Sequence, residues 1–159
     1  MRRLEVAANI LLIIVTIMVG FTLVVNYRAR RPVSRPSLTG RELPIHDIAW
    51  SDYSRTLVLI LRKECRFCRE SSPFYRRLVL QAHARHVRVI AILPDSPADA
   101  RLYLAGEEIA VDCIVQLRAN DVRVAGTPTL LTVNRQGVVE KEWVGKVPSE
   151  KEEEVIRSL

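Results

Sequence analysis

Residues 56–70, which decide the fold, have the sequence TLVLILRKECRFCRE. The run from Thr56 to Leu61 is almost continuously apolar and bounded by charge, as expected of a buried strand. Cys65 and Cys68 follow at the predicted start of a helix, so their sulfurs lie one turn apart, within bonding reach. Unsatisfied backbone N–H groups at that position favour a thiolate. The stretch therefore has the geometry that thiol–disulfide exchange needs.

The rest of the domain predicts alternating helices and strands. We expect a helix from Cys65 to about His83, kinked at Pro73 because proline removes one N–H, with Phe74, Tyr75, Leu78 and Leu80 on its core face. The other predicted elements are a strand at 87–93, a helix at 97–105 with Ser96 as N-cap, a strand at 113–117, hairpin strands at 129–133 and 138–143, and a helix starting at Pro148 with Ser149 and Glu152 at capping-box spacing. This order predicts an α/β fold with a mixed sheet flanked by helices.

The N-terminal region predicts a membrane anchor. Residues 6–27 contain no charged side chain, and about 20 such residues are needed to cross a bilayer as a helix. No small-residue cleavage site follows, which favours an uncleaved anchor over a signal peptide. We therefore predict three parts: a transmembrane anchor at 1–27, a basic, Pro-containing linker at 28–43, and a domain at 44–159.

The basic charge of the chain belongs to the predicted anchor region. Residues 1–43 hold seven Arg and two Glu, whereas residues 44–159 hold seventeen Lys and Arg against sixteen Asp and Glu. A nucleic-acid-binding face would need the excess positive charge on the domain itself. The pattern predicts contact with a lipid bilayer and no nucleic-acid partner.

Four features together resemble the thioredoxin superfamily, and most closely its membrane-anchored TlpA/ResA-like branch, over residues 50–158. They are Cys65-Arg66-Phe67-Cys68 after a buried strand, Pro73 five residues later, Gly126-Thr127-Pro128-Thr129 before an apolar strand, and the hairpin sequence Asn134-Arg135-Gln136-Gly137-Val138 followed by Trp143-Val144-Gly145. The resemblance implies a thioredoxin-like sheet and a cis peptide bond at Pro128. It also implies that the Thr127 backbone pairs with an extended substrate segment.

Some residues depart from the family pattern. The family often has a buried acid six residues before the first cysteine, where this chain has Leu59. Lys63-Glu64 replaces the aromatic residue before the motif, and Phe67 replaces the frequent proline within it. These departures leave the redox potential and the handling of protons open.

Cys65 is expected to be the exposed nucleophile, because Arg62, Lys63, Arg66 and Arg69 lie close in sequence and positive charge stabilises a thiolate. Cys68 is expected to be more buried and to resolve the mixed disulfide; a structural disulfide is the alternative. Beyond that redox-active disulfide, we predict no cofactor. Cys113 begins an apolar strand and is expected to be a buried thiol. His83 and His86 have a spacing that could bind a metal, but no further ligand is near in sequence, so we predict no metal site.

The leading hypothesis is a membrane-tethered thiol–disulfide oxidoreductase that acts on protein thiols and disulfides and is supplied by a membrane or soluble thiol donor. The resemblance to TlpA/ResA-like proteins suggests that the chain acts as a reductant in extracytoplasmic protein maturation or in cytochrome c maturation. A peroxiredoxin-like peroxidase is disfavoured, because Arg62 occupies the position where that chemistry needs Thr. A copper-handling module using the thiols as ligands and a non-catalytic interaction module are further alternatives.

The side of the membrane is predicted from the resemblance. Five Arg after the anchor favour a cytoplasmic domain by the positive-inside rule. Most anchored relatives have the domain outside the cytoplasm, and we give this resemblance more weight. The prediction is a single-pass protein of the cell membrane with its domain on the periplasmic side.

Overall fold

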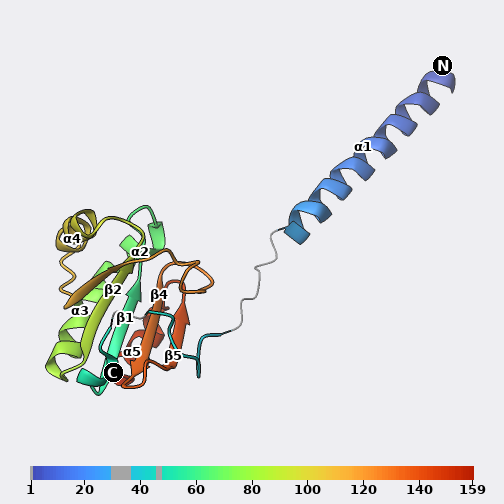
Figure 1. Cartoon of the computed structure of the whole chain (residues 1–159). Coiled ribbons are helices and arrows are strands. Elements are labelled where there is room, and N and C mark those ends of the chain that lie inside the picture. Colours follow the sequence, from blue (N-terminus) through green and yellow to red (C-terminus); the bar gives the residue numbers. More distant parts are fainter. Residues whose placement is uncertain (1, 30–36, 46–47) are drawn as a thin grey trace. The chain divides into compact units, whose positions relative to one another are not determined.

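The computed structural model describes residues 2–29, 37–45 and 48–159, without the side chains of 2–8, 11 and 26–29. It divides into two compact units, Met1–Ser34 and Arg35–Leu159. The elements are α1 (Arg2–Ala29), η1 (Trp50–Asp52), β1 (Arg55–Ile60), α2 (Arg66–Glu70), α3 (Ser72–Ala84), β2 (Arg88–Leu93), α4 (Pro97–Gly106), β3 (Cys113–Gln116), β4 (Thr129–Asn134), β5 (Val139–Val144) and α5 (Ser149–Arg157) (Figure 1).

The first unit contains α1, whose described side chains are exposed and mostly apolar. A search of the described residues finds no helix with the length and apolar character that a membrane crossing requires. The predicted transmembrane helix at 1–27 is therefore not confirmed. Residues 30–36 of the predicted linker at 28–43 lie outside the described residues.

The second unit is built on a five-stranded mixed sheet in the order β3-β2-β1-β4-β5. β1 pairs in parallel with β2, and β2 pairs in parallel with β3. β4 pairs antiparallel with both β1 and β5. The central strand β1 is buried along most of its length, which agrees with the apolar run in the sequence.

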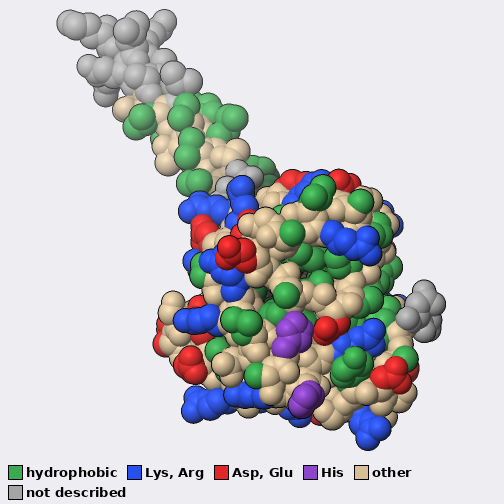
Figure 2. All heavy atoms as spheres, turned by 90° about the vertical axis from the view of Figure 1, so that its left-hand side faces the viewer, with side chains coloured by type: hydrophobic (Ala, Val, Ile, Leu, Met, Phe, Trp, Pro, Cys, Tyr) green, Lys and Arg blue, Asp and Glu red, His purple; other side chains and the backbone are tan. Residues whose placement is uncertain are grey.

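Two apolar clusters cover the two faces of this sheet. Leu57 and Leu59 pack in the cluster that receives α3, α4 and α5, whereas Val58 and Ile60 pack in the cluster on the opposite face. This alternation follows the two-residue period of a strand. Figure 2 shows one side of the domain, where Lys and Arg side chains are interspersed with Asp and Glu.

The domain begins earlier than the predicted boundary at residue 44. Leu38 and Leu43 are buried in the cluster on the face opposite α3. The backbone N–H of Leu38 donates to the Glu142 carboxylate at 2.8 Å, and Glu42 forms a β-bridge with Val138. Residues 37–43 therefore belong to the domain, because a short apolar and hydrogen-bonding segment lies inside the region whose composition predicted a linker.

The predicted helix from Cys65 to His83 consists of two helices. α2 ends at Glu70, Ser71 makes the junction, and α3 begins at Ser72 with Pro73 in its first turn. Proline fits a first turn well, because the N–H that it lacks has no partner in the helix there. The chain thus breaks just before Pro73, where the sequence predicted a kink.

Three smaller predictions have different outcomes. Ser96 caps α4 by accepting a hydrogen bond from the Asp99 N–H at 3.2 Å, as predicted. The predicted capping box at Ser149 is wrong, because Pro148 is the N-cap of α5 and gives no side-chain cap. Leu80 was expected on the core face of its helix but is 68% exposed.

Candidate active site

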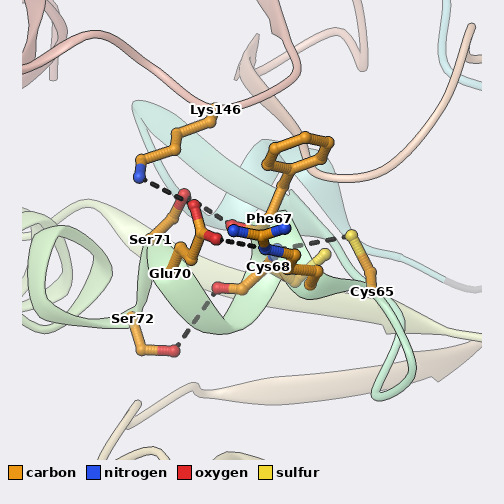
Figure 3. Close-up of polar contacts among 8 residues, drawn as sticks. Cys65, Phe67, Cys68, Glu70, Ser71, Ser72 and Lys146 are labelled. Atoms are coloured by element: carbon orange, nitrogen blue, oxygen red, sulfur yellow. Dashed lines mark hydrogen bonds and ion pairs between the residues drawn. The ribbon is translucent and has the colours of Figure 1, made fainter.

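Cys65 lies where the chain leaves β1 and enters α2. It is the N-cap of α2, and its sulfur accepts a hydrogen bond from the Cys68 N–H at 3.3 Å. The Cys65 thiol donates to the Thr127 carbonyl oxygen, with a sulfur–oxygen distance of 3.4 Å. Figure 3 shows the Cys65 sulfur joined by a dashed line to the Cys68 backbone nitrogen. Cys65, which the sequence predicted to be exposed, is thus half-buried, because backbone groups of Cys68 and Thr127 hold its sulfur.

The two thiols of the motif have different environments. Cys65 is half-buried, whereas Cys68 is fully buried, and both are free thiols. Burial is the largest single effect and raises the pKa of Cys65. The Cys68 and Thr127 side chains and the backbone N–H groups of Cys68 and Phe67 together outweigh it, so this pKa is lowered. Burial and the neighbouring Cys65 raise the pKa of Cys68 to about 12. Cys65 is therefore the thiol that ionises first.

The predicted substrate-binding loop lies beside Cys65. The Thr127–Pro128 peptide bond is cis, as predicted from the resemblance. Gly145 N–H donates to the Pro128 carbonyl at 2.7 Å, and the Thr129 hydroxyl donates to the Gly126 carbonyl at 2.8 Å. These bonds hold the loop against the end of β5, next to the half-buried sulfur.

An ion-pair bridge that the sequence analysis missed connects α2 with the segment after β5. The Glu70 carboxylate contacts Arg66 Nε at 2.6 Å and Lys146 Nζ at 2.9 Å (Figure 3). These two cations lower the pKa of Glu70, Lys146 first. The spacing of Arg66 and Glu70 by four residues predicts their contact, but nothing in the sequence indicates Lys146.

The remaining residues of the motif are accessible to a partner. Phe67 is 54% exposed and stands beside Cys65 in the motif. Pro73 is exposed and lies in the first turn of α3, where it marks the break between α2 and α3. An exposed aromatic ring next to a nucleophilic sulfur gives an apolar contact surface for a substrate chain.

Cys113 lies on a different part of the sheet from the Cys65–Cys68 pair. It begins the edge strand β3, is half-buried rather than buried, and packs against the cluster on the face opposite α3. Cys68 packs in the cluster on the α3 face. The structure therefore does not bring the third cysteine to the motif.

His83 and His86, whose spacing could suit a metal, lie at and just after the end of α3. His83 lies near the end of α3 with its Nε2 atom 3.4 Å from the Asp112 carboxylate, and His86 follows with a positive φ angle. In the part of the chain that the structure describes, no three His, Cys, Asp or Glu side chains are grouped as a metal ion would require.

No protein-family description and no curated protein sequence matches this chain. Solved structures do match it. A thiol:disulfide interchange protein assigned to the DsbE type, from Chlorobium tepidum, is 25% identical, with 66% of this chain and 79% of that chain covered and a TM-score of 0.52. A thiol-disulfide isomerase from Corynebacterium glutamicum is 16% identical, with 79% and 96% covered and a TM-score of 0.57.

A third similar structure is the thioredoxin domain of a thiol-disulfide oxidoreductase from Bacteroides vulgatus. It is 14% identical, with 80% of this chain and 95% of that chain covered and a TM-score of 0.53. These likenesses confirm the predicted thioredoxin-like fold. The names of the neighbours also agree with the prediction of a thioredoxin-like oxidoreductase. The TlpA/ResA-like branch and the membrane anchor stay predictions.

Proposed function

We propose that this chain exchanges disulfides with protein cysteines through Cys65 and Cys68. The main evidence is the difference between the two thiols. Cys65 is half-buried and its pKa is lowered, whereas Cys68 is fully buried and its pKa is raised to about 12. Only a thiolate attacks a disulfide. The pair is therefore suited to act in sequence, Cys65 first and Cys68 second.

The reaction needs two exchange steps. The Cys65 thiolate attacks one sulfur of a substrate disulfide, and the other substrate sulfur leaves as a thiolate and takes up a proton. The Cys68 thiol then loses its proton and attacks the Cys65 sulfur, which releases the second substrate thiolate. The substrate gains two electrons and two protons, and the protein gains the Cys65–Cys68 disulfide. An external dithiol returns it to the reduced state.

The substrate chain is expected to lie along the loop at Gly126, Thr127 and Pro128. This loop is next to the half-buried Cys65 sulfur, and Phe67 provides an exposed apolar surface within the motif. An extended segment can pair there with backbone groups of Thr127. Backbone pairing of this kind needs a substrate cysteine that lies within a polypeptide chain. It therefore supports protein cysteines as substrates.

The membrane location belongs to the proposal and rests on the sequence. Residues 6–27 hold no charge, and the resemblance to anchored relatives favours a domain outside the cytoplasm. There it would serve as a reductant in protein or cytochrome c maturation. Alkaline phosphatase matures only where disulfides form. A fusion after Leu159 is expected to be active, and an inactive but well-expressed fusion would place the domain in the cytoplasm.

The proposed chemistry is tested by turnover. The full-length chain is expected to reduce insulin disulfides when dithiothreitol is supplied, and Cys65→Ser is expected to abolish the reaction above the rate of dithiothreitol alone. Equal rates for wild type and Cys65→Ser would contradict the proposal.

A further inference from the structure

The second exchange step needs a charge to form in a buried place. Cys68 has no exposed surface, and its thiol must become a thiolate to attack Cys65. Its raised pKa of about 12 measures how strongly burial and the neighbouring Cys65 oppose this charge. The strand beneath offers no acid or base at Leu59, which is fully buried in the same cluster. The Arg62 backbone and Thr127 favour the thiolate of Cys68 but do not outweigh its burial, so a further hydrogen-bond donor would ease its formation.

Two tyrosine hydroxyls in that region have no hydrogen-bond partner. Within the described part of the chain, the Tyr75 and Tyr103 oxygens are both buried and unpaired. The Ser71 hydroxyl is near Tyr75, but it donates to the Phe67 carbonyl at 2.8 Å, and its contact with Tyr75 does not reach hydrogen-bond geometry. An unpaired buried hydroxyl lowers the stability of the fold. Two such hydroxyls in one apolar cluster therefore suggest that they serve the reaction.

Both tyrosines lie in or against the apolar cluster that surrounds Cys68, and neither hydroxyl is hydrogen-bonded to it while it is a thiol. Tyr75, on α3, packs in the same cluster as Cys68, and Tyr103, on α4, packs against that cluster. Burial comes first in raising the pKa of each phenol, and among charged neighbours Cys68 has the largest effect on each. Cys65 also acts on both phenols, and Glu107 and Arg69 act on Tyr103. α3 and α4 thus each contribute a buried O–H group, unpaired among the described residues, to the cluster that contains Cys68.

We propose that the Tyr75 and Tyr103 hydroxyls stabilise the Cys68 thiolate as it forms, and so speed the release of the bound substrate. This inference rests on the proposed function. The phenols keep their protons throughout and act as hydrogen-bond donors, since their pKa values are raised. The proton that Cys68 loses goes through solvent to the departing substrate thiolate. No oxidant or reductant beyond the substrate disulfide is required.

The two steps can be observed separately with 5,5′-dithiobis(2-nitrobenzoate). Attack by Cys65 releases one nitrothiobenzoate anion, and attack by Cys68 on the resulting mixed disulfide releases a second. The full-length chain is used in a Cys113→Ala background, so that the third thiol gives no signal. The variants are Tyr75→Phe, Tyr103→Phe and both together. Tyr53→Phe is the matched control, because Tyr53 lies before the start of β1 with its ring under Arg88.

The first release is expected to keep its rate within about twofold in every variant. The second release is expected to slow about tenfold in the double variant, because a hydrogen bond to a charged group is lost, and its pH midpoint is expected to rise. Tyr53→Phe is expected to leave both phases unchanged. The urea midpoints of the Tyr75 and Tyr103 variants are expected to stay level or rise, since each loses an unpaired hydroxyl.

Three results would contradict the inference. An unchanged second phase with an unchanged pH midpoint would mean that the hydroxyls do not act on Cys68, while the two phases themselves would leave the proposed function standing. A fall in stability in the Phe variants would mean that the hydroxyls have a structural partner. A wild type that releases no second anion would overturn the proposed function and the inference with it.

Discussion

The Cys65 sulfur lies 3.4 Å from the carbonyl oxygen of Thr127, a residue 62 positions later in the chain. This contact joins the motif after β1 to the loop before β4, because these two strands are antiparallel neighbours in the sheet. A substrate chain paired with the loop would therefore hold its disulfide at the half-buried sulfur.

The two thiols of the motif are expected to ionise at different pH values. The pKa of Cys65 is lowered from 9.0, and that of Cys68 is raised to about 12. Iodoacetamide reacts with thiolates, so the rate at Cys65 is expected to reach half its plateau below pH 9, and Cys68 is expected to stay unmodified there. Mass mapping of the modified Cys113→Ala chain measures this. A common midpoint near pH 9 would contradict the assignment of roles.

The Glu70 bridge is expected to make stability depend on pH. Arg66 and Lys146 lower the pKa of Glu70 below its unfolded value of 4.5, so its contribution is present above that value and is lost as pH falls through the folded pKa. Glu70→Gln is expected to lower the urea midpoint at pH 7, and this difference is expected to shrink below about pH 4.5. In a Lys146→Met background the effect of Glu70→Gln is expected to be smaller. A pH-independent difference would contradict this.

The turn between β4 and β5 is expected to require Gly137. Its φ angle is +78°, and a Cβ atom there would meet the Trp50 ring at 3.0 Å. Gly137→Ala is expected to cost about 1–3 kcal/mol in urea unfolding. Gly106→Ala is the control, because its Cβ would have open space at the end of α4, and it is expected to gain about 0.5–1 kcal/mol. Equal effects of the two changes would contradict the steric argument.

Cys113 is expected to take no part in turnover. It lies on β3 and packs on the sheet face opposite Cys68, so neither sulfur of the motif meets it. Cys113→Ala is expected to keep insulin reduction within about twofold of wild type, since a change far from the reacting atoms alters packing only. A large loss of turnover would place this thiol in the mechanism.

Much of the sheet and the cysteine pair could be predicted from local sequence. The apolar run at 56–61 and the turn residues around Gly137 determine β1 and the β4–β5 hairpin through patterns within a few residues. The break at Ser71 and the cap at Pro148 were missed, because helix ends depend on single backbone angles that several sequences satisfy.

The position of Thr127 beside Cys65 was predicted only from the family resemblance, because no local pattern relates residues 62 positions apart. Lys146 and Tyr103 could not be predicted at all. Lys146 meets Glu70 from the segment after β5, and Tyr103 on α4 packs against the cluster that contains Cys68. The sequence around each of them is ordinary for an exposed loop or a helix. Contacts of this kind depend on tertiary packing, and a single sequence carries no pattern for them.

The central claim is that Cys65 attacks a substrate disulfide and Cys68 releases it. The most direct measurement is mass spectrometry of the full-length Cys68→Ser chain after incubation with insulin and rapid blocking of free thiols. We predict a stable mixed disulfide between an insulin cysteine and Cys65, which the wild type does not accumulate because Cys68 resolves it. The absence of an adduct on Cys65, or an equal yield of adduct in the Cys65→Ser chain, would contradict the claim.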